Sequence, residues 1–166
     1  MPKSDKPLII MGIDPGFADM GFGIVTKKSG KLSAVTYGSI KTSSKTPMPQ
    51  RLAQIYQEIN ELIKKHHPDV IAIEQLFFYK NITTAIAVAQ ARGVIILAAG
   101  QHQLTLKEAS PLHVKMALTG YGKATKSQMQ QMVKLVLKLK VIPKPDDAAD
   151  ALAVAICCSN INLQKI

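Results

Sequence analysis

Residues 8–16 have the sequence LIIMGIDPG, which decides the predicted fold. A short apolar run closed by Pro15-Gly16 indicates a buried strand that ends at a carboxylate, Asp14. Met20–Thr26 and Leu32–Ile40 predict two further strands. Because the connections between these runs are short, we expect the three strands to form an antiparallel meander.

The rest of the chain predicts helices alternating with two more strands. Leu52–Ile63 has the apolar spacing of an amphipathic helix, and Val70–Ile73 is an apolar strand that ends at Glu74. A strand reached through a helix normally runs parallel to an earlier one, so Asp14 and Glu74 are expected at the same sheet edge. Further patterns predict a helix over Thr84–Ala99, a strand over Leu104–Ser110, and helices over Pro111–Leu118, Met129–Leu137 and Asp147–Cys158. The order βββαβαβααα indicates an α/β fold with a mixed five-stranded sheet, and residues 1–166 contain no linker or repeat that would divide one domain.

The predicted helix over Thr84–Ala99 is apolar on nearly every face. Asn81 or Thr83 can cap its start, and Gly100 is placed to end it. A helix of this kind needs cover on both sides, for which the sheet and a second subunit are the candidates.

The charge balance is strongly basic. The chain has 21 Lys and Arg residues against 11 Asp and Glu, a formal net charge of +10, and a pI of about 9.7. Such a field attracts polyanions, of which nucleic acid comes first and an anionic membrane surface second, although a merely soluble basic protein has the same balance. Only Arg51 and Arg92 are arginines, and lysine contacts phosphates as a point charge, so backbone binding is favoured over base reading.

Two features bear on location. Cys157 and Cys158 are adjacent, which is neither a redox pair nor half of a zinc site, so we expect two small apolar residues in a reducing compartment. The first residues lack the form of a signal peptide, and no run of 18 apolar residues predicts a transmembrane helix. These patterns predict a cytoplasmic protein without a membrane span.

Four carboxylates stand out by their positions. Asp14 and Glu74 end apolar strands, Asp150 lies among alanines, and Asp147 shares a helix face with Asp150. Burying an unpaired carboxylate costs roughly several kcal/mol, so folding alone does not favour acids at such places. Structural interpretations remain open at this point: Asp14 as a turn residue, and Asp147 or its neighbour Asp146 as a helix N-cap.

Oxygen ligands in this number suit Mg²⁺ or Mn²⁺, and no His or Cys group near them suggests zinc. Removing the four acids from the eleven leaves seven against 21 basic residues, so the pattern predicts an acidic site on a basic surface. Two metal ions about 4 Å apart can activate a water and stabilise the leaving 3′-oxygen of a phosphodiester. We therefore predict a nuclease with Asp14, Glu74, Asp147 and Asp150 as catalytic residues and ligands of two Mg²⁺ ions, with Mn²⁺ as a substitute.

Six segments, in this order along nearly the whole chain, resemble the RuvC family of Holliday-junction resolvases in the RNase H-like superfamily. They are Gly12-Ile13-Asp14-Pro15-Gly16, Gly21-Phe22-Gly23, Ile73-Glu74-Gln75-Leu76-Phe77, Gln90-Ala91-Arg92-Gly93, Lys126-Ser127-Gln128 and Asp147-Ala148-Ala149-Asp150-Ala151-Leu152-Ala153.

The resemblance implies a homodimer that binds four-way junction DNA, nicks two strands symmetrically in recombination and repair, and works with the RuvAB branch-migration complex. It implies the same four acids as metal ligands, places Lys115 and Lys126 beside the scissile phosphate, and has Phe77 stack on a base. The chain departs from the family pattern in two places. Tyr79 adds an aromatic residue, and a connection about one residue longer brings Asp146 beside Asp147, although the spacing to Asp150 favours Asp147 as the ligand.

Two loops are the further DNA-binding candidates. Phe77, Phe78 and Lys80 lie between a strand and a helix, where aromatic residues and lysine suit stacking and phosphate contact, although the aromatics can instead pack under the loop. Lys123, with Lys115 and Lys126 on either side, belongs to a glycine loop that can grip the DNA backbone or be only a solvated turn.

Two other classes of function have partial support. Gly12-Ile13-Asp14 resembles the phosphate segment of actin-like nucleotide-binding proteins, but those need two domains and this chain supplies one. A non-catalytic junction-binding protein would use the same basic surface, but it would be expected to have a broken acidic set.

Overall fold

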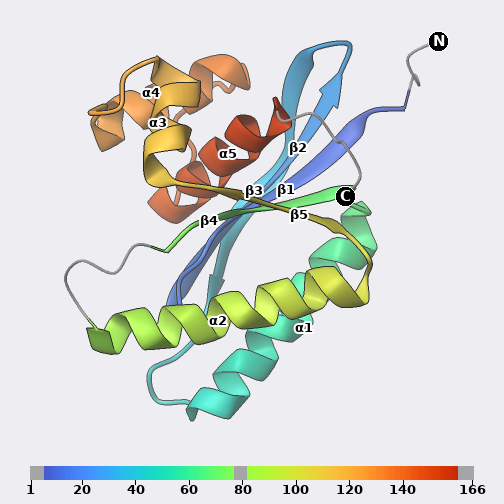
Figure 1. The fold of residues 1–166 in the computed structure, drawn as a ribbon, viewed down its shortest axis with the longest axis vertical. Helices are drawn as coiled ribbons and strands as arrows, with labels where there is room; N and C mark the ends of the chain where they lie inside the picture. The colour runs from blue at the N-terminus through green and yellow to red at the C-terminus, as the bar shows by residue number, and fades with distance from the viewer. Residues whose placement is uncertain (1–5, 77–81, 161–166) are drawn as a thin grey trace.

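The computed structural model describes residues 6–76 and 82–160, and its centre is a five-stranded sheet in the order β3-β2-β1-β4-β5 (Figure 1). The strands are β1 (Leu8–Asp14), β2 (Asp19–Lys28), β3 (Lys31–Lys41), β4 (Val70–Glu74) and β5 (Thr105–Ala109). β1, β2 and β3 form an antiparallel meander, β4 is parallel to β1, and β5 is parallel to β4. The predicted mixed sheet and the predicted order of elements are confirmed.

Helices cover both faces of this sheet (Figure 1). They are α1 (Met48–His66), α2 (Ile82–Gln101), α3 (Pro111–Thr119), α4 (Lys126–Val136) and α5 (Asp146–Ser159). α5 packs on one face with α3 and α4 against it, and α1 and α2 form the other layer. Cys157 and Cys158 are buried free thiols of α5, as expected.

The two faces of the sheet follow from the alternation of side chains along β1 and β4. Ile10 on β1 and Ala72 on β4 belong to the core under α5, whereas Ile13 and Ile73 belong to the core under α1 and α2. Because successive side chains of a strand point to opposite faces, the next residues, Asp14 and Glu74, belong to the α5 face. Ile13 pairs with Ile73, so both carboxylates leave the sheet at the same edge.

Most helix ends have identifiable caps. Thr125 and Gln128 form a reciprocal capping box at the start of α4. α1 ends at His66, and the following residue, His67, caps it in a left-handed conformation with its backbone N–H donating to the Ile63 carbonyl. The prediction that Thr83 caps α2 is wrong, because the helix begins at Ile82, and the other candidate, Asn81, lies outside the described residues. α2 also continues to Gln101, two residues beyond the predicted end at Ala99, so Gly100 does not end it.

α2 is long and apolar enough to cross a membrane when judged by length and composition alone, although no run of 18 apolar residues predicts a span. Only 22% of Thr84–Gln101 is buried. The core helix of a soluble protein can meet the same two criteria, so the distinctive property of α2 is that its apolar surface is left uncovered.

Candidate active site

The four predicted carboxylates meet at the carboxyl end of β1 and β4. Asp14 is the last residue of β1, and Glu74 is the last residue of β4. Asp147 and Asp150 enter from the first turns of α5, which crosses the same sheet face. The hairpin partner β2, the parallel pairing of β1 with β4, and α5 therefore determine the place of the acids, and only β2 is close to β1 in sequence.

Two glycines allow α5 to lie directly on the strand backbone. A Cβ added at Gly21 would lie 1.9 Å from the carbonyl oxygen of Asp147, and one at Gly12 would lie 2.1 Å from that of Ala151. Both distances are far below van der Waals contact, so any larger residue would push α5 away. The glycines thus bring the acidic end of α5 close to Asp14.

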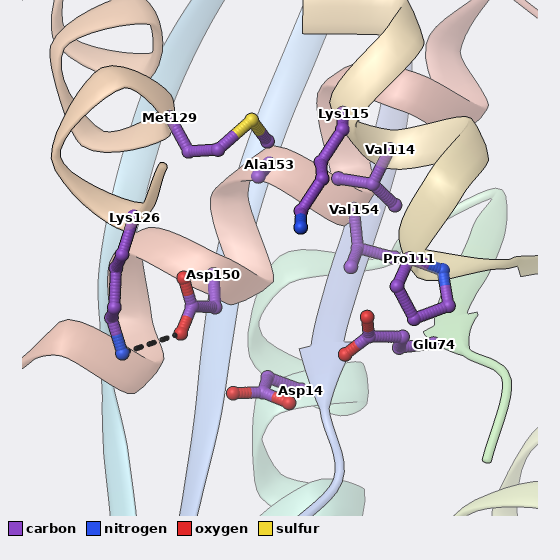
Figure 2. A pocket seen from close by; sticks show the side chains of 10 residues that line it. All are labelled: Asp14, Glu74, Pro111, Val114, Lys115, Lys126, Met129, Asp150, Ala153 and Val154. Carbon is purple, nitrogen blue, oxygen red and sulfur yellow. Dashed lines mark ion pairs between the residues drawn. The ribbon is translucent and has the colours of Figure 1, made fainter. Parts of the chain in front are cut away.

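The carboxylate oxygens are close enough to share a cation. One oxygen each from Asp14, Asp147 and Asp150 lies within 4.8 Å of the other two. Asp14, Glu74 and Asp150 line a cavity of about 270 Å³ (Figure 2). Its apolar wall is formed by Pro111, Val114, Met129, Ala153 and Val154.

The surroundings neutralise the acids only in part. Burial, followed by the charges of Glu74, Asp150 and Asp147, raises the pKa of Asp14 to about 8. Burial and the charge of Asp150 likewise raise the pKa of Glu74, and burial raises that of Asp150 against the opposing effect of Lys126. Crowded carboxylates with raised pKa values have a deficit of positive charge, which protons or a metal ion can supply. An all-oxygen donor set fits a hard divalent cation.

Two of the predicted lysines reach this cavity. Lys126, at the start of α4, places its Nζ 3.1 Å from Oδ2 of Asp150 (Figure 2). Lys115 on α3 lines the cavity, and its charge partly opposes the rise in the pKa of Glu74. Lys123 is exposed in the loop between α3 and α4 and is not among the lining residues. Phe77, Phe78 and Lys80 lie outside the described residues.

Asp146 takes a different position from Asp147. The interpretation of either residue as an N-cap is wrong, because Pro145 occupies the cap position and α5 begins at Asp146. Lys144 Nζ donates to Oδ1 of Asp146 at 2.7 Å, so this carboxylate is paired outside the acid cluster. The 100° step between neighbouring helix residues separates the two aspartates, as expected for an α-helix.

The sequence patterns missed two parts of the site. They did not indicate that Gly12 and Gly21 are contact points for α5, although both stand in the quoted motifs. They also did not indicate the apolar wall, because Val114 and Met129 resemble ordinary core residues of amphipathic helices. Glycines two residues before and seven residues after the strand-terminal acid Asp14 would have been the available signal for the first part.

The fold and the acid cluster together define a nuclease of the RNase H-like class, in which carboxylates gather at the edge of a mixed sheet. Residues 10–158 match the profile of the family described as crossover junction endodeoxyribonuclease RuvC. A relative of that name from Alkaliphilus metalliredigens is 55% identical over 150 residues, which are 90% of this chain and 92% of the relative. The chain therefore belongs to the RuvC family of crossover junction endodeoxyribonucleases.

Solved structures agree with this assignment. Thermus thermophilus RuvC superimposes with a TM-score of 0.85 at 33% identity, over 92% of this chain and 93% of that one. T. thermophilus RuvC in complex with a Holliday junction substrate gives a TM-score of 0.84 at 30% identity, with the same coverage. Neither the actin-like nor the non-catalytic alternative is favoured by these likenesses.

Proposed function

We propose that this protein is a structure-selective endonuclease that resolves four-way DNA junctions by paired symmetric nicks during homologous recombination and repair. The observation that carries the proposal is the cluster of Asp14, Asp147 and Asp150. It adjoins a cavity lined by Asp14, Asp150 and Glu74 together with Lys115 and Lys126. The net charge of +10 for the whole chain, which includes the four acids, favours a polyanionic substrate. Family membership and the junction complex of the T. thermophilus relative support the choice of junction DNA.

The four acids are proposed as catalytic residues and as ligands of two Mg²⁺ ions, with Mn²⁺ as a substitute. When bound, these ions supply an activated water and charge stabilisation for the leaving 3′-oxygen. Asp14, whose pKa is about 8, is poised to exchange its proton for a metal ion near neutral pH. The apolar wall of Val114 and Met129 limits water on the opposite side of the cavity.

The lysines and the loop after β4 are proposed to hold the DNA. Lys115 and Lys126 are placed to contact the phosphate next to the acids, and exposed Lys123 to contact the backbone further away. Phe77, Phe78 and Lys80 keep their predicted roles in base stacking and phosphate contact.

A homodimer is proposed because paired nicks need two sites and because α2 has an uncovered seam. The exposed residues of this seam alternate in steps of four and three along the helix: Ile86, Gln90, Gly93, Leu97 and Gly100. Such spacing is that of helices packed side by side, and added Cβ atoms at Gly93 and Gly100 would meet nothing within 4 Å. A second copy of α2 would cover the surface that this chain leaves open.

Residues 1–166 are proposed to act as one nuclease domain in the cytoplasm, free of the membrane. The RuvAB branch-migration complex is the proposed partner, on the strength of the family alone.

A synthetic four-way junction with Mg²⁺ provides the test. The parent protein should nick two opposed strands, and EDTA should abolish the reaction. Asp14→Asn should lower the cleavage rate by about 10³-fold or more while junction binding is retained. Glu61→Gln, which removes an exposed acid of α1, is the matched control and should cleave like the parent.

Rapid cleavage in EDTA would overturn the metal mechanism. Equal cleavage of a linear duplex would retain the nuclease and reject its selectivity for junctions.

A further inference from the structure

Lys126 lies between two carboxylates of α5, of which only one belongs to the acid cluster. Its Nζ is 3.1 Å from Oδ2 of Asp150 and 3.8 Å from Oδ2 of Asp146. The Lys126 side chain is 55% exposed, so it has room to move between the two. The same ammonium thus has one partner inside the proposed metal site and one at its rim.

A second lysine, Lys144, fixes the Asp146 side chain where it can make this second contact. Lys144 Nζ donates to its Oδ1 at 2.7 Å, which leaves Oδ2 for Lys126. Asp146 therefore offers a negative oxygen whose position does not depend on Lys126.

A divalent cation on Asp150 competes with Lys126 for the same carboxylate. Lys126 and the metal ion would both be positive and only a few ångströms apart, which is unfavourable in a partly buried cavity. A lysine ammonium on a flexible stem can give way by rotating, whereas the helical Asp150 cannot follow it. Without another partner near by, the displaced ammonium would move into solvent.

We propose that Asp146 is a positioning residue that accepts the Lys126 ammonium when a divalent cation occupies Asp150. Lys126 then stays at the rim of the cavity, within reach of a phosphate, instead of competing with the metal ion. The inference rests on the proposed function, because it takes Asp150 as a ligand. It also gives a role to the third acid in the first turns of α5, which lies outside the cluster of Asp14, Asp147 and Asp150.

A double-mutant cycle on Mg²⁺ affinity, measured by titration calorimetry without DNA, tests this role. The four proteins are the parent, Asp146→Asn, Lys126→Met and the double variant. In the parent background, Asp146→Asn should weaken Mg²⁺ binding by about two- to fivefold, because Lys126 is left with Asp150 alone. In the Lys126→Met background, the same substitution should have little effect, since no ammonium remains to be displaced.

Equal weakening in both backgrounds would overturn the inference, because Asp146 would then act only through its charge. Unchanged affinity with a lower melting temperature would also overturn it, because Asp146 would then only stabilise the N-terminus of α5. Asp146→Glu keeps the carboxylate and should restore most of the Mg²⁺ affinity. On junction DNA, Asp146→Asn should lower kcat more than it raises KM.

The proposed function and this inference fail in different ways. A parent protein that neither binds Mg²⁺ nor cleaves a junction would defeat the proposed function. A parent that does both, with an additive cycle, would defeat the inference alone.

Discussion

α5 and α2 are both apolar helices, but the fold uses them in opposite ways. Apart from Asp150, α5 is buried from Ala148 to Ser159, between the sheet and the pair α3 and α4. α2 lies on the other face, contacts mainly α1, and has only 22% of Thr84–Gln101 buried. An apolar helix therefore needs other apolar surfaces packed against it. Those surfaces can belong to the same chain or to another molecule.

Glycines lie against α5 and on α2, but their surroundings differ. Gly12 and Gly21 already lie against the backbone of α5, where no Cβ fits. Gly93 and Gly100 on α2 face open space. We interpret the first pair as part of a contact formed within the chain. We interpret the second pair as part of the surface that a second copy of α2 would cover in the proposed dimer.

The largest expected effect is at the contact of α5 with the sheet. Gly21→Ala should lower junction cleavage by about 100-fold, because the methyl group would displace Asp147 from the acid cluster. Overpacking should also destabilise the fold by about 1–3 kcal/mol. Cleavage assays and urea unfolding measure the two effects. Parent-like cleavage by Gly21→Ala would show that α5 can shift without harm to the site.

The next effect concerns the α2 seam. Leu97→Glu should weaken the proposed dimer by about 30-fold, since a charge would replace an apolar side chain that is 55% exposed in the single chain. Sedimentation measures the dissociation, and paired nicking of one junction should fall with it. Leu135→Glu, at a similarly exposed apolar residue of α4, is the control. A monomeric parent, or an unchanged dimer in Leu97→Glu, would contradict the proposed seam.

The third prediction uses the pKa of about 8 for Asp14 against an unfolded value of 3.8. The folded state favours the protonated form of Asp14. The contribution of this protonation to the free energy of unfolding is fully present below pH 3.8 and is lost progressively as the pH rises through about 8. Without metal, Asp14→Asn should melt above the parent by a margin that grows from about pH 5 to pH 9. Mg²⁺ should raise the melting temperature of the parent at high pH and leave the variant nearly unchanged. A margin independent of pH would reject the raised pKa.

The smallest expected effect is at an open glycine of α2. Gly93→Ala should stabilise the folded monomer by about 0.5–1 kcal/mol, because alanine is the better helix former and no atom obstructs its Cβ. The same methyl group should weaken the close approach of two α2 helices in the proposed dimer. For this one variant, the free energy of unfolding of the monomer should thus rise, whereas dimer association measured by sedimentation should weaken. A loss of monomer stability would place Gly93 with Gly21 instead.

Much of the fold could be predicted because its signals are local. The predicted first strand has the same bounds as β1, and the spacing of Leu52–Ile63 correctly placed α1. Prediction was weaker at helix ends: the Thr83 cap was wrong because the helix already begins at Ile82. Helix ends depend on the few hydrogen bonds that α-helices leave unsatisfied, and several nearby residues can satisfy them equally well.

Local sequence patterns predict which elements form and which acids lie at unfavourable positions, because periodicity and burial cost are properties of neighbouring residues. The choice between Asp147 and Asp146 is made by tertiary contacts: Asp147 joins Asp14 and Asp150, whereas Asp146 contacts Lys144 and Lys126. That choice depends on how α5 lies across the backbone of β1 and β2 at Gly12 and Gly21. These contacts join residues more than a hundred positions apart, and no local pattern encodes the rotation of a helix about its own axis.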